Sequence, residues 1–138
     1  VAARDPNVAD AIAMTVAAFD ASLILFGLSG SALPAAGTRA GLRVAHEVFA
    51  ERGYGDDGQL LPRDTPGAVI ESIDDAIAQV RELATSGAVM SVNGRRLALR
   101  ADTLCLHGDR VEAASFAQSL RRALEADAVR ILPVGATA

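Results

Sequence analysis

The order of helix-like and strand-like segments constrains the fold of this chain most. Asp5-Pro6 is typical of a helix start, because the carboxylate accepts hydrogen bonds from free N–H groups and proline fits the first helical position. Apolar residues then recur at helical spacing, namely Val8, Ile12, Val16 and Phe19. The continuous apolar run 22–26 follows, as expected of a strand covered on both faces.

The same alternation continues to the end of the chain. The predicted helices span 31–41, 72–87 and 111–124, the last with Phe116, Leu120 and Leu124 facing inward. The predicted strands are 42–45, a central strand 103–106 and a last strand 129–132. Asn93-Gly94 between alternating segments predicts a hairpin over 89–99. This order predicts one α/β domain, residues 1–138, with parallel strands alternating with helices plus one β-hairpin.

The only two histidines occupy similar positions in this pattern. His46-Glu47 and His107-Gly-Asp109 each come just after a predicted strand. Ligand sites of α/β sheets lie at the carboxyl ends of the strands, so both pairs are candidates for catalysis. We expect His107 to act as an acid or base oriented by Asp109; the alternative is that this pair only caps the following helix. For Glu47, the alternative is a surface salt bridge with Arg52.

Residues 48–67 form a polar, glycine-rich segment without a regular pattern. Such long irregular segments are usually functional or mobile. Arg52 and Arg63 are candidates to bind a substrate carboxylate or phosphate, and Tyr54 to donate a hydrogen bond to substrate. The alternatives are solvated arginines and a tyrosine that packs the loop.

Composition narrows the classes of partner and chemistry. All 13 basic residues are arginine, which excludes Schiff-base and P-loop lysines on this chain. A net charge of −4 argues against nucleic acid or an anionic membrane as a partner. Cys105 lies inside an apolar strand, as expected of a small core residue. With neither a signal peptide pattern nor an apolar run long enough for a membrane helix, we expect a cytoplasmic protein.

Two further signals are weaker. The turn Gly27-Leu-Ser-Gly30 follows a strand and could bind an anion, but it lacks the full dinucleotide fingerprint. Metal binding by His46, His107 and carboxylates is chemically possible, but no closely spaced ligand motif supports it, and the metal requirement stays unknown.

Four segments together resemble the LamB/YcsF family, the A subunits of bacterial 5-oxoprolinase. They are His46-Glu-Val-Phe-Ala-Glu-Arg-Gly-Tyr54, Gly58-Gln-Leu-Leu-Pro-Arg63, Pro66-Gly-Ala68 and Asp102-Thr-Leu-Cys-Leu-His-Gly-Asp109. The usual family form of the first segment has Asp where this chain has Glu51. The resemblance runs from about Val1 to Leu132, and it matches only the C-terminal half of a typical family member.

The resemblance implies part of a distorted (β/α)7 TIM-like barrel of the glycoside hydrolase/deacetylase type. It also implies ATP-dependent hydrolytic ring opening of 5-oxo-L-proline to L-glutamate, together with B and C subunits. ATP could bind at a partner subunit, and the missing N-terminal half or a homo-oligomer would complete the barrel. Two alternatives stay open, a non-catalytic half-barrel that binds partners and a metal-dependent deacetylase-like hydrolase.

Overall fold

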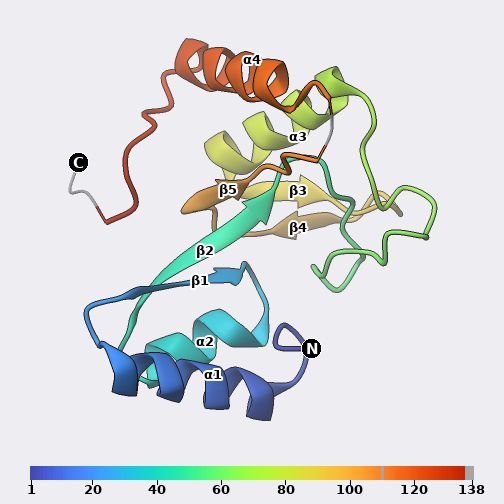
Figure 1. The fold of residues 1–138 in the computed structure, drawn as a ribbon. Coiled ribbons are helices and arrows are strands. Elements are labelled where there is room, and N and C mark those ends of the chain that lie inside the picture. Colours follow the sequence, from blue (N-terminus) through green and yellow to red (C-terminus); the bar gives the residue numbers. More distant parts are fainter. Residues whose placement is uncertain (110, 136–138) are drawn as a thin grey trace.

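The computed structural model describes residues 1–109 and 111–135. Helices and strands alternate along most of the chain, as expected (Figure 1). The helices are α1 (Pro6–Phe19), α2 (Ala32–Arg39), α3 (Ile73–Ser86) and α4 (Ala113–Ala126). The strands are β1 (Ile24–Leu28), β2 (Arg43–Phe49), β3 (Ala88–Met90), β4 (Arg96–Ala98) and β5 (Thr103–Cys105).

The main sheet has three parallel strands in the order β1-β2-β5. The prediction that 103–106 forms the central strand was therefore wrong, because β2 lies in the middle and β5 pairs only with β2 among the described residues. Strand β2 is also longer than predicted and contains His46 and Glu47, which were expected beyond its end. Its pairing with both neighbours keeps these residues extended: Glu47 is opposite Leu28 on β1 and Thr103 on β5.

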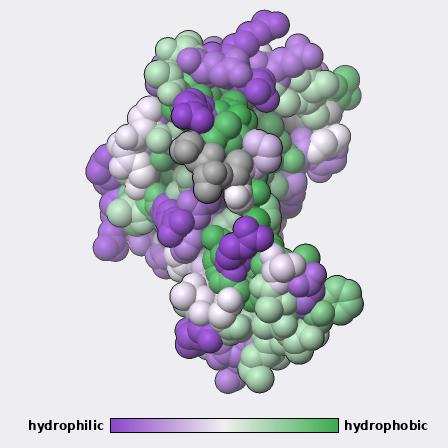
Figure 2. Space-filling model, turned by 90° about the vertical axis from the view of Figure 1, so that its left-hand side faces the viewer, coloured by the Kyte–Doolittle hydropathy of each residue, from purple (hydrophilic) through white to green (hydrophobic). Residues whose placement is uncertain are grey.

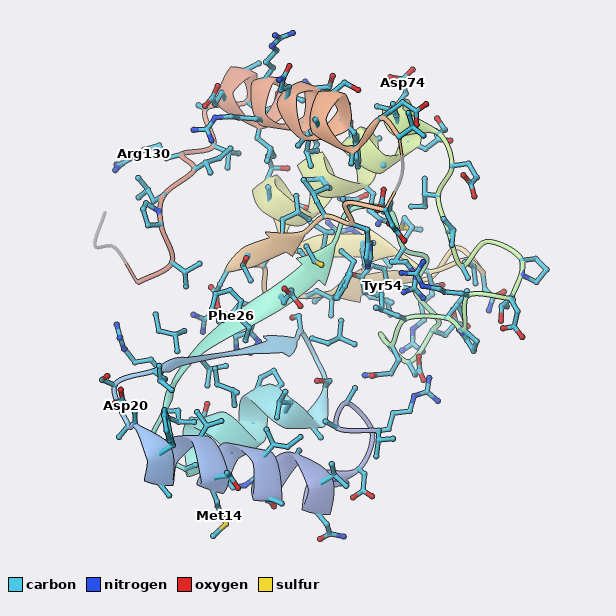
Figure 3. The ribbon with its side chains drawn as sticks, in the orientation of Figure 1. Met14, Asp20, Phe26, Tyr54, Asp74 and Arg130 are labelled. Atoms are coloured by element: carbon cyan, nitrogen blue, oxygen red, sulfur yellow. The ribbon has the colours of Figure 1, made fainter. Side chains whose placement is uncertain are left out.

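Helices α1 and α2 pack together against β1 (Figure 1). The buried side of α1 carries Ala9 and Ala13, whereas Ile12 and Phe19 are 37% and 85% exposed. The predicted inward face of α1 was therefore rotated by about one residue. Small alanine side chains let α1 lie close to α2, and Val16 packs against the same core as predicted. Ile12, Met14 and Phe19 face outward, as Met14 does in Figure 3.

Helices α3 and α4 cover the other end of the sheet (Figure 1). Phe116, Leu120 and Leu124 of α4 are buried against Ala76 and Val80 of α3, which confirms the predicted inward face of α4. Ser72 caps α3 through its side chain, which accepts a hydrogen bond from the Asp75 N–H, and Gly87 ends the helix in a left-handed conformation.

The hairpin β3-β4 confirms the Asn93-Gly94 prediction, with Gly94 at a positive φ of 81°. It lies beside the irregular segment 50–72 (Figure 1). Two isolated antiparallel bridges hold that segment, Arg52 with Val69 and Tyr54 with Leu60. The chain crosses itself closely at Gly53, where a Cβ atom would lie 2.0 Å from the Gly67 carbonyl oxygen.

The predicted last strand, 129–132, was wrong. These residues follow α4 without regular structure, and no strand pairs with them in the described part of the chain. Their apolar side chains explain the error, because Val129 packs against the α3-α4 core without joining the sheet.

The surface narrows between an upper part with α3 and α4 and a lower part with α1 and α2 (Figure 2). Hydrophobic residues reach the surface at this waist in Figure 2. Within residues 1–109 and 111–135, no helix is both long enough and apolar enough to cross a membrane.

Candidate functional site

The two faces of β2 carry different residues. Side chains alternate between the faces of a strand, so His46 and Glu47 point in opposite directions. A Cβ atom on Gly27, the β1 partner of His46, would lie 2.8 Å from Pro34 of α2, so this face is covered by helix. Glu47 lies on the opposite face. The two residues therefore do not form one site, although they are adjacent in sequence.

We call the opposite face the open face of the sheet, defined by Phe26, Glu47, Phe49, Thr103 and Cys105, which alternation and register place together. Phe26 is 43% exposed there, while its neighbour Leu25 is buried against α1 and α2 (Figure 3). The open face thus combines an exposed aromatic ring with a carboxylate and a thiol near the carboxyl ends of β2 and β5.

His107 lies just beyond β5, and its ring is paired with a buried carboxylate. Its Nδ1 atom is 3.1 Å from the Glu51 Oε1 atom, and the same oxygen accepts a hydrogen bond from the His107 backbone N–H at 3.3 Å. The Glu51 side chain is 6% exposed and that of His107 is 25% exposed. A buried carboxylate therefore fixes the imidazole while part of the ring still reaches the surface.

Asp109, the predicted partner of His107, is exposed, and the Nδ1 atom of His107 is paired with Glu51 instead. The orienting role expected of Asp109 thus falls to a residue on the segment after β2. Sequence reasoning missed Glu51. Its position five residues after His46, within the segment that resembles the family, was the available signal, but only folding brings it to His107.

The Phe49 and Tyr54 rings support this pair. The Phe49 ring stacks on the imidazole of His107 with a centroid distance of 6.0 Å and an angle of 30°. The backbone N–H of Phe49 donates to the Tyr54 hydroxyl at 2.9 Å. Tyr54 of the irregular segment is fully buried against β2 (Figure 3), and this burial raises its pKa to about 12. The hydrogen bond to Tyr54 thus fixes the backbone of Phe49, whose ring contacts the imidazole of His107.

Cys105 is half-buried on the same face. Burial raises the pKa of its thiol, and the nearby carboxylates of Glu47 and Glu51 raise it further. Both effects favour the neutral thiol over the thiolate, which is the nucleophilic form. Cys105 thus lies near the other site residues, but its environment does not favour a reactive thiolate.

Two of the predicted substrate-binding residues are internal. Arg52 is buried and donates from Nε to the Ala68 carbonyl at 3.1 Å and from a terminal nitrogen to the Leu61 carbonyl at 2.5 Å. Burial, and then the positive charge of Arg63, lower its pKa. Arg52 and the buried Tyr54 therefore hold the irregular segment together and are not accessible to a ligand in this structure. Arg63 is exposed.

His46 has a different environment from His107. Its Nδ1 atom is buried without a hydrogen-bond partner in the described structure, and its backbone N–H donates to the Asp102 carboxylate at 3.0 Å. Burial raises the pKa of Asp102, but hydrogen bonds from His46 and Arg100 outweigh it and the net pKa is lowered. His46 and Asp102 thus join β2 to the start of β5.

Main-chain hydrogen bonds occupy three N–H groups in and just after the glycine turn that follows β1. The Ser29 N–H donates to Glu47, the Ser31 N–H to Leu28 and the Ala32 N–H to Ala3. These three N–H groups are therefore already bonded and do not point to an anion site.

Two cavities lie beside the sheet. One, of about 580 Å³, is lined by β5, α3, α4 and residues 129–134. The other, of about 620 Å³, lies at the amino ends of β1 and β2. Neither is lined by Glu51 or His107.

The arrangement offers an imidazole that can take or give a proton, with a buried carboxylate fixed behind it and a second carboxylate, Glu47, on the open face. Within 1–109 and 111–135, no group of three or more His, Cys, Asp or Glu side chains could hold a metal ion. The pairing of His107 with Glu51 is a geometry that suits proton transfer.

Comparison with known proteins identifies relatives along the whole chain. The profile of the LamB/YcsF family matches residues 1–138. The 5-oxoprolinase A subunit of Bordetella pertussis is 49% identical over 131 residues, which cover 95% of this chain and 52% of that protein. The 5-oxoprolinase A subunit of Bacillus subtilis is 47% identical over 134 residues, which cover 97% of this chain and 52% of that protein.

The crystal structure of a lactam utilization protein from Thermus thermophilus has the same fold, with a TM-score of 0.84 and 40% identity. The match covers 94% of this chain and 51% of that one, so this chain spans about half the length of the relatives it matches. The parallel α/β fold and the match to the family profile agree, and the chain belongs to the LamB/YcsF family.

Proposed function

We propose that this chain supplies the His107 site of a 5-oxoprolinase A subunit, which opens the ring of 5-oxo-L-proline to L-glutamate in an ATP-dependent reaction. The support is family membership together with two relatives, each named as the A subunit of 5-oxoprolinase and 47% or more identical. The substrate, the ATP requirement and the B and C subunits are parts of the proposal.

The reaction adds water across an amide bond. The carbonyl carbon gains the water oxygen, the bond from carbon to the ring nitrogen breaks, and that nitrogen gains a proton. A lactam resists this step because its amide is resonance-stabilised, and coupling to ATP would make the opening favourable. A base must remove a proton from the attacking water and an acid must protonate the leaving nitrogen.

One observation supports these roles most directly, namely the pairing of the partly exposed imidazole of His107 with the buried carboxylate of Glu51. His107 would transfer protons at its outer nitrogen, and Glu47 would face the substrate from β2 on the open face. His46 and Asp109, the other predicted site residues, would act less directly, since His46 lies on the covered face and Asp109 does not contact the imidazole nitrogen that Glu51 holds.

The proposed architecture is part of a (β/α)7 TIM-like barrel that a further segment completes. The family relatives extend over about twice the length of this chain, and Phe26 is exposed on the open face. We propose that the remaining half of the subunit, or a second copy, covers this face and closes the substrate pocket. Arg63, which is exposed, stays a candidate for binding a substrate carboxylate, and a cytoplasmic location stays a prediction.

The test is an assay of glutamate formation from 5-oxo-L-proline by the chain assembled with the rest of the A subunit and with the B and C subunits. We expect activity that requires ATP and every component, and its loss in His107→Ala. Glutamate formation without ATP, or full activity of His107→Ala, would contradict the proposal.

Two other functions remain distinguishable. A non-catalytic half-barrel would bind the partner subunits with no turnover in the complete assembly. A metal-dependent deacetylase-like hydrolase would lose activity on addition of a chelator and show no need for ATP. The pairing of His107 with a carboxylate favours the first proposal over a purely structural role.

A further inference from the structure

Glu51 is a buried acidic residue at the start of the irregular segment. Its neighbour Ala50 is fully buried, and Glu51 itself is 5% exposed. The backbone carbonyls of Phe49, Ala50 and Arg52 all accept from the side-chain amide of Gln79 on α3. The main chain on both sides of Glu51 is thus held to α3, so the position of its carboxylate is set by the fold.

Burying a carboxylate is costly unless hydrogen bonds compensate for the lost water. Glu51 accepts two such bonds from one residue, the backbone N–H and the ring Nδ1 of His107. An ionised carboxylate only accepts hydrogen bonds, so this contact favours the His107 tautomer that carries its proton at Nδ1. The Nε2 atom of neutral His107 is then left without a proton and can act as a base.

We infer that Glu51 is the positioning residue for His107: its carboxylate holds the imidazole in the tautomer protonated at Nδ1 and stabilises the imidazolium formed when Nε2 takes a proton. The inference rests on the proposed function for its kinetic consequence, but the tautomer of His107 can be measured independently. Phe49 stacks on the ring at 6.0 Å and restricts its tilt, while Glu51 fixes its rotation.

Two variants separate the charge of Glu51 from its capacity to accept hydrogen bonds. Glu51→Gln keeps a carbonyl oxygen that can accept from Nδ1–H and removes the negative charge. Glu51→Leu removes both and has a similar volume. Glu51→Asp keeps the charge on a shorter side chain. Phe49→Leu is the matched control, because it removes the stacked ring and leaves the carboxylate in place.

The first measurement is ¹⁵N spectroscopy of this chain, labelled at histidine and assembled with the rest of the A subunit. The chain has only two histidines, so the His46 signal is an internal reference. We expect Nδ1–H at His107 in the unsubstituted chain and in Glu51→Asp, and a shift toward Nε2–H in Glu51→Leu with the His46 signal unchanged. An unchanged tautomer in Glu51→Leu would overturn the inference.

The second measurement is the steady-state kinetics of the same variants with ATP, 5-oxo-L-proline and the B and C subunits. We expect kcat to fall about 10²-fold in Glu51→Gln with KM changed less than about threefold, within the range of general acid–base effects. Glu51→Asp should recover at least part of the loss. If Glu51→Gln changed KM but left kcat unaltered, the inference would be overturned.

The two experiments also separate the inference from the proposed function. If Glu51→Leu shifts the tautomer but His107→Ala keeps full activity, the pairing is correct and the catalytic role of His107 is wrong. If the tautomer does not shift and His107→Ala is inactive, the role of His107 is supported and the positioning role of Glu51 is overturned.

Discussion

The two faces of the three-stranded sheet differ in what covers them, although side chains alternate between the faces along every strand. On the covered face, Leu25 and Leu104 pack against helices in the apolar cores of the lower and upper parts of the molecule. On the open face, Phe26, Glu47 and Cys105 occupy equivalent positions one residue along, without a helix over them in the described structure. A single alternation therefore separates the residues that stabilise the fold from those that can meet a substrate.

The two histidines follow the same division. His46 extends toward the covered face, and its Nδ1 atom is buried and unpaired in the described structure. His107 lies after the end of β5, pairs with Glu51 and remains 25% exposed. Each histidine has an acidic residue close by in the sequence, so the two were predicted to have similar roles. The pleat of β2 and the path of the segment after β2 place them in different environments.

The largest expected effect tests the packing side of this comparison. Phe116→Ala removes a ring that is 1% exposed in the α3-α4 core, and we expect the free energy of unfolding to fall by about 3–5 kcal/mol. Phe26→Ala on the open face is the matched control, with an expected loss of less than about 1 kcal/mol. Urea titrations of both variants provide the measurement. Equal losses of unfolding free energy in the two variants would show that Phe26 is packed as closely as Phe116, and would contradict an exposed open face.

A smaller effect is expected from the Tyr54 hydroxyl. Tyr54→Phe leaves the partly buried backbone N–H of Phe49 without its acceptor, and we expect a loss of about 1–3 kcal/mol in the free energy of unfolding. Urea titration again measures the loss, and the ¹⁵N signal of His107 should broaden because Phe49 stacks on its ring. A fully stable variant with an unchanged His107 signal would contradict a connection from the Tyr54 hydroxyl through Phe49 to His107.

The smallest effect is a loss of stability at alkaline pH. The pKa of Tyr54 is raised from 10.0 to about 12, so the unfolded chain releases this proton at lower pH than the folded one. The stabilisation from neutral Tyr54 is complete below pH 10 and is lost as pH rises toward 12, with a loss of about 1.4 kcal/mol at pH 11. Tyr54 is the only tyrosine, so its absorbance change reports the titration directly. A midpoint near 10 in the folded chain would contradict burial, and Tyr54→Phe, which cannot ionise, is the control.

Much of the fold was predictable because periodicity and caps are local. Asp5-Pro6, Ser72 and Asn93-Gly94 each marked the start of a helix or the turn of a hairpin, and the structure confirms all three. Strand order was not predictable in the same way: β2 became central because β1 and β5 pair on either side of it, a contact between distant segments. The run 129–132 looked like a strand because apolar residues suit both a strand and a packed coil.

The candidate site was predictable only in part. His107 was identified because it follows a predicted strand, and a strand can be predicted from the local alternation of residues. Its partner was assigned to Asp109 because sequence proximity was the only guide, while the buried carboxylate of Glu51 arrives from 56 positions earlier in the chain. Arg52 was expected to face a substrate, but its guanidinium satisfies two carbonyls of the irregular segment. Such long-range contacts have no periodic signal.

The most direct test of this account compares His107→Ala with His46→Ala in the assembled enzyme, under conditions in which both variants are shown to be folded. We expect kcat for glutamate formation from 5-oxo-L-proline to fall by about 10²-fold or more in His107→Ala. We expect a kcat within about threefold of the unsubstituted enzyme in His46→Ala, because that ring faces the covered side of the sheet. Loss of activity in His46→Ala with retention in His107→Ala would contradict the account.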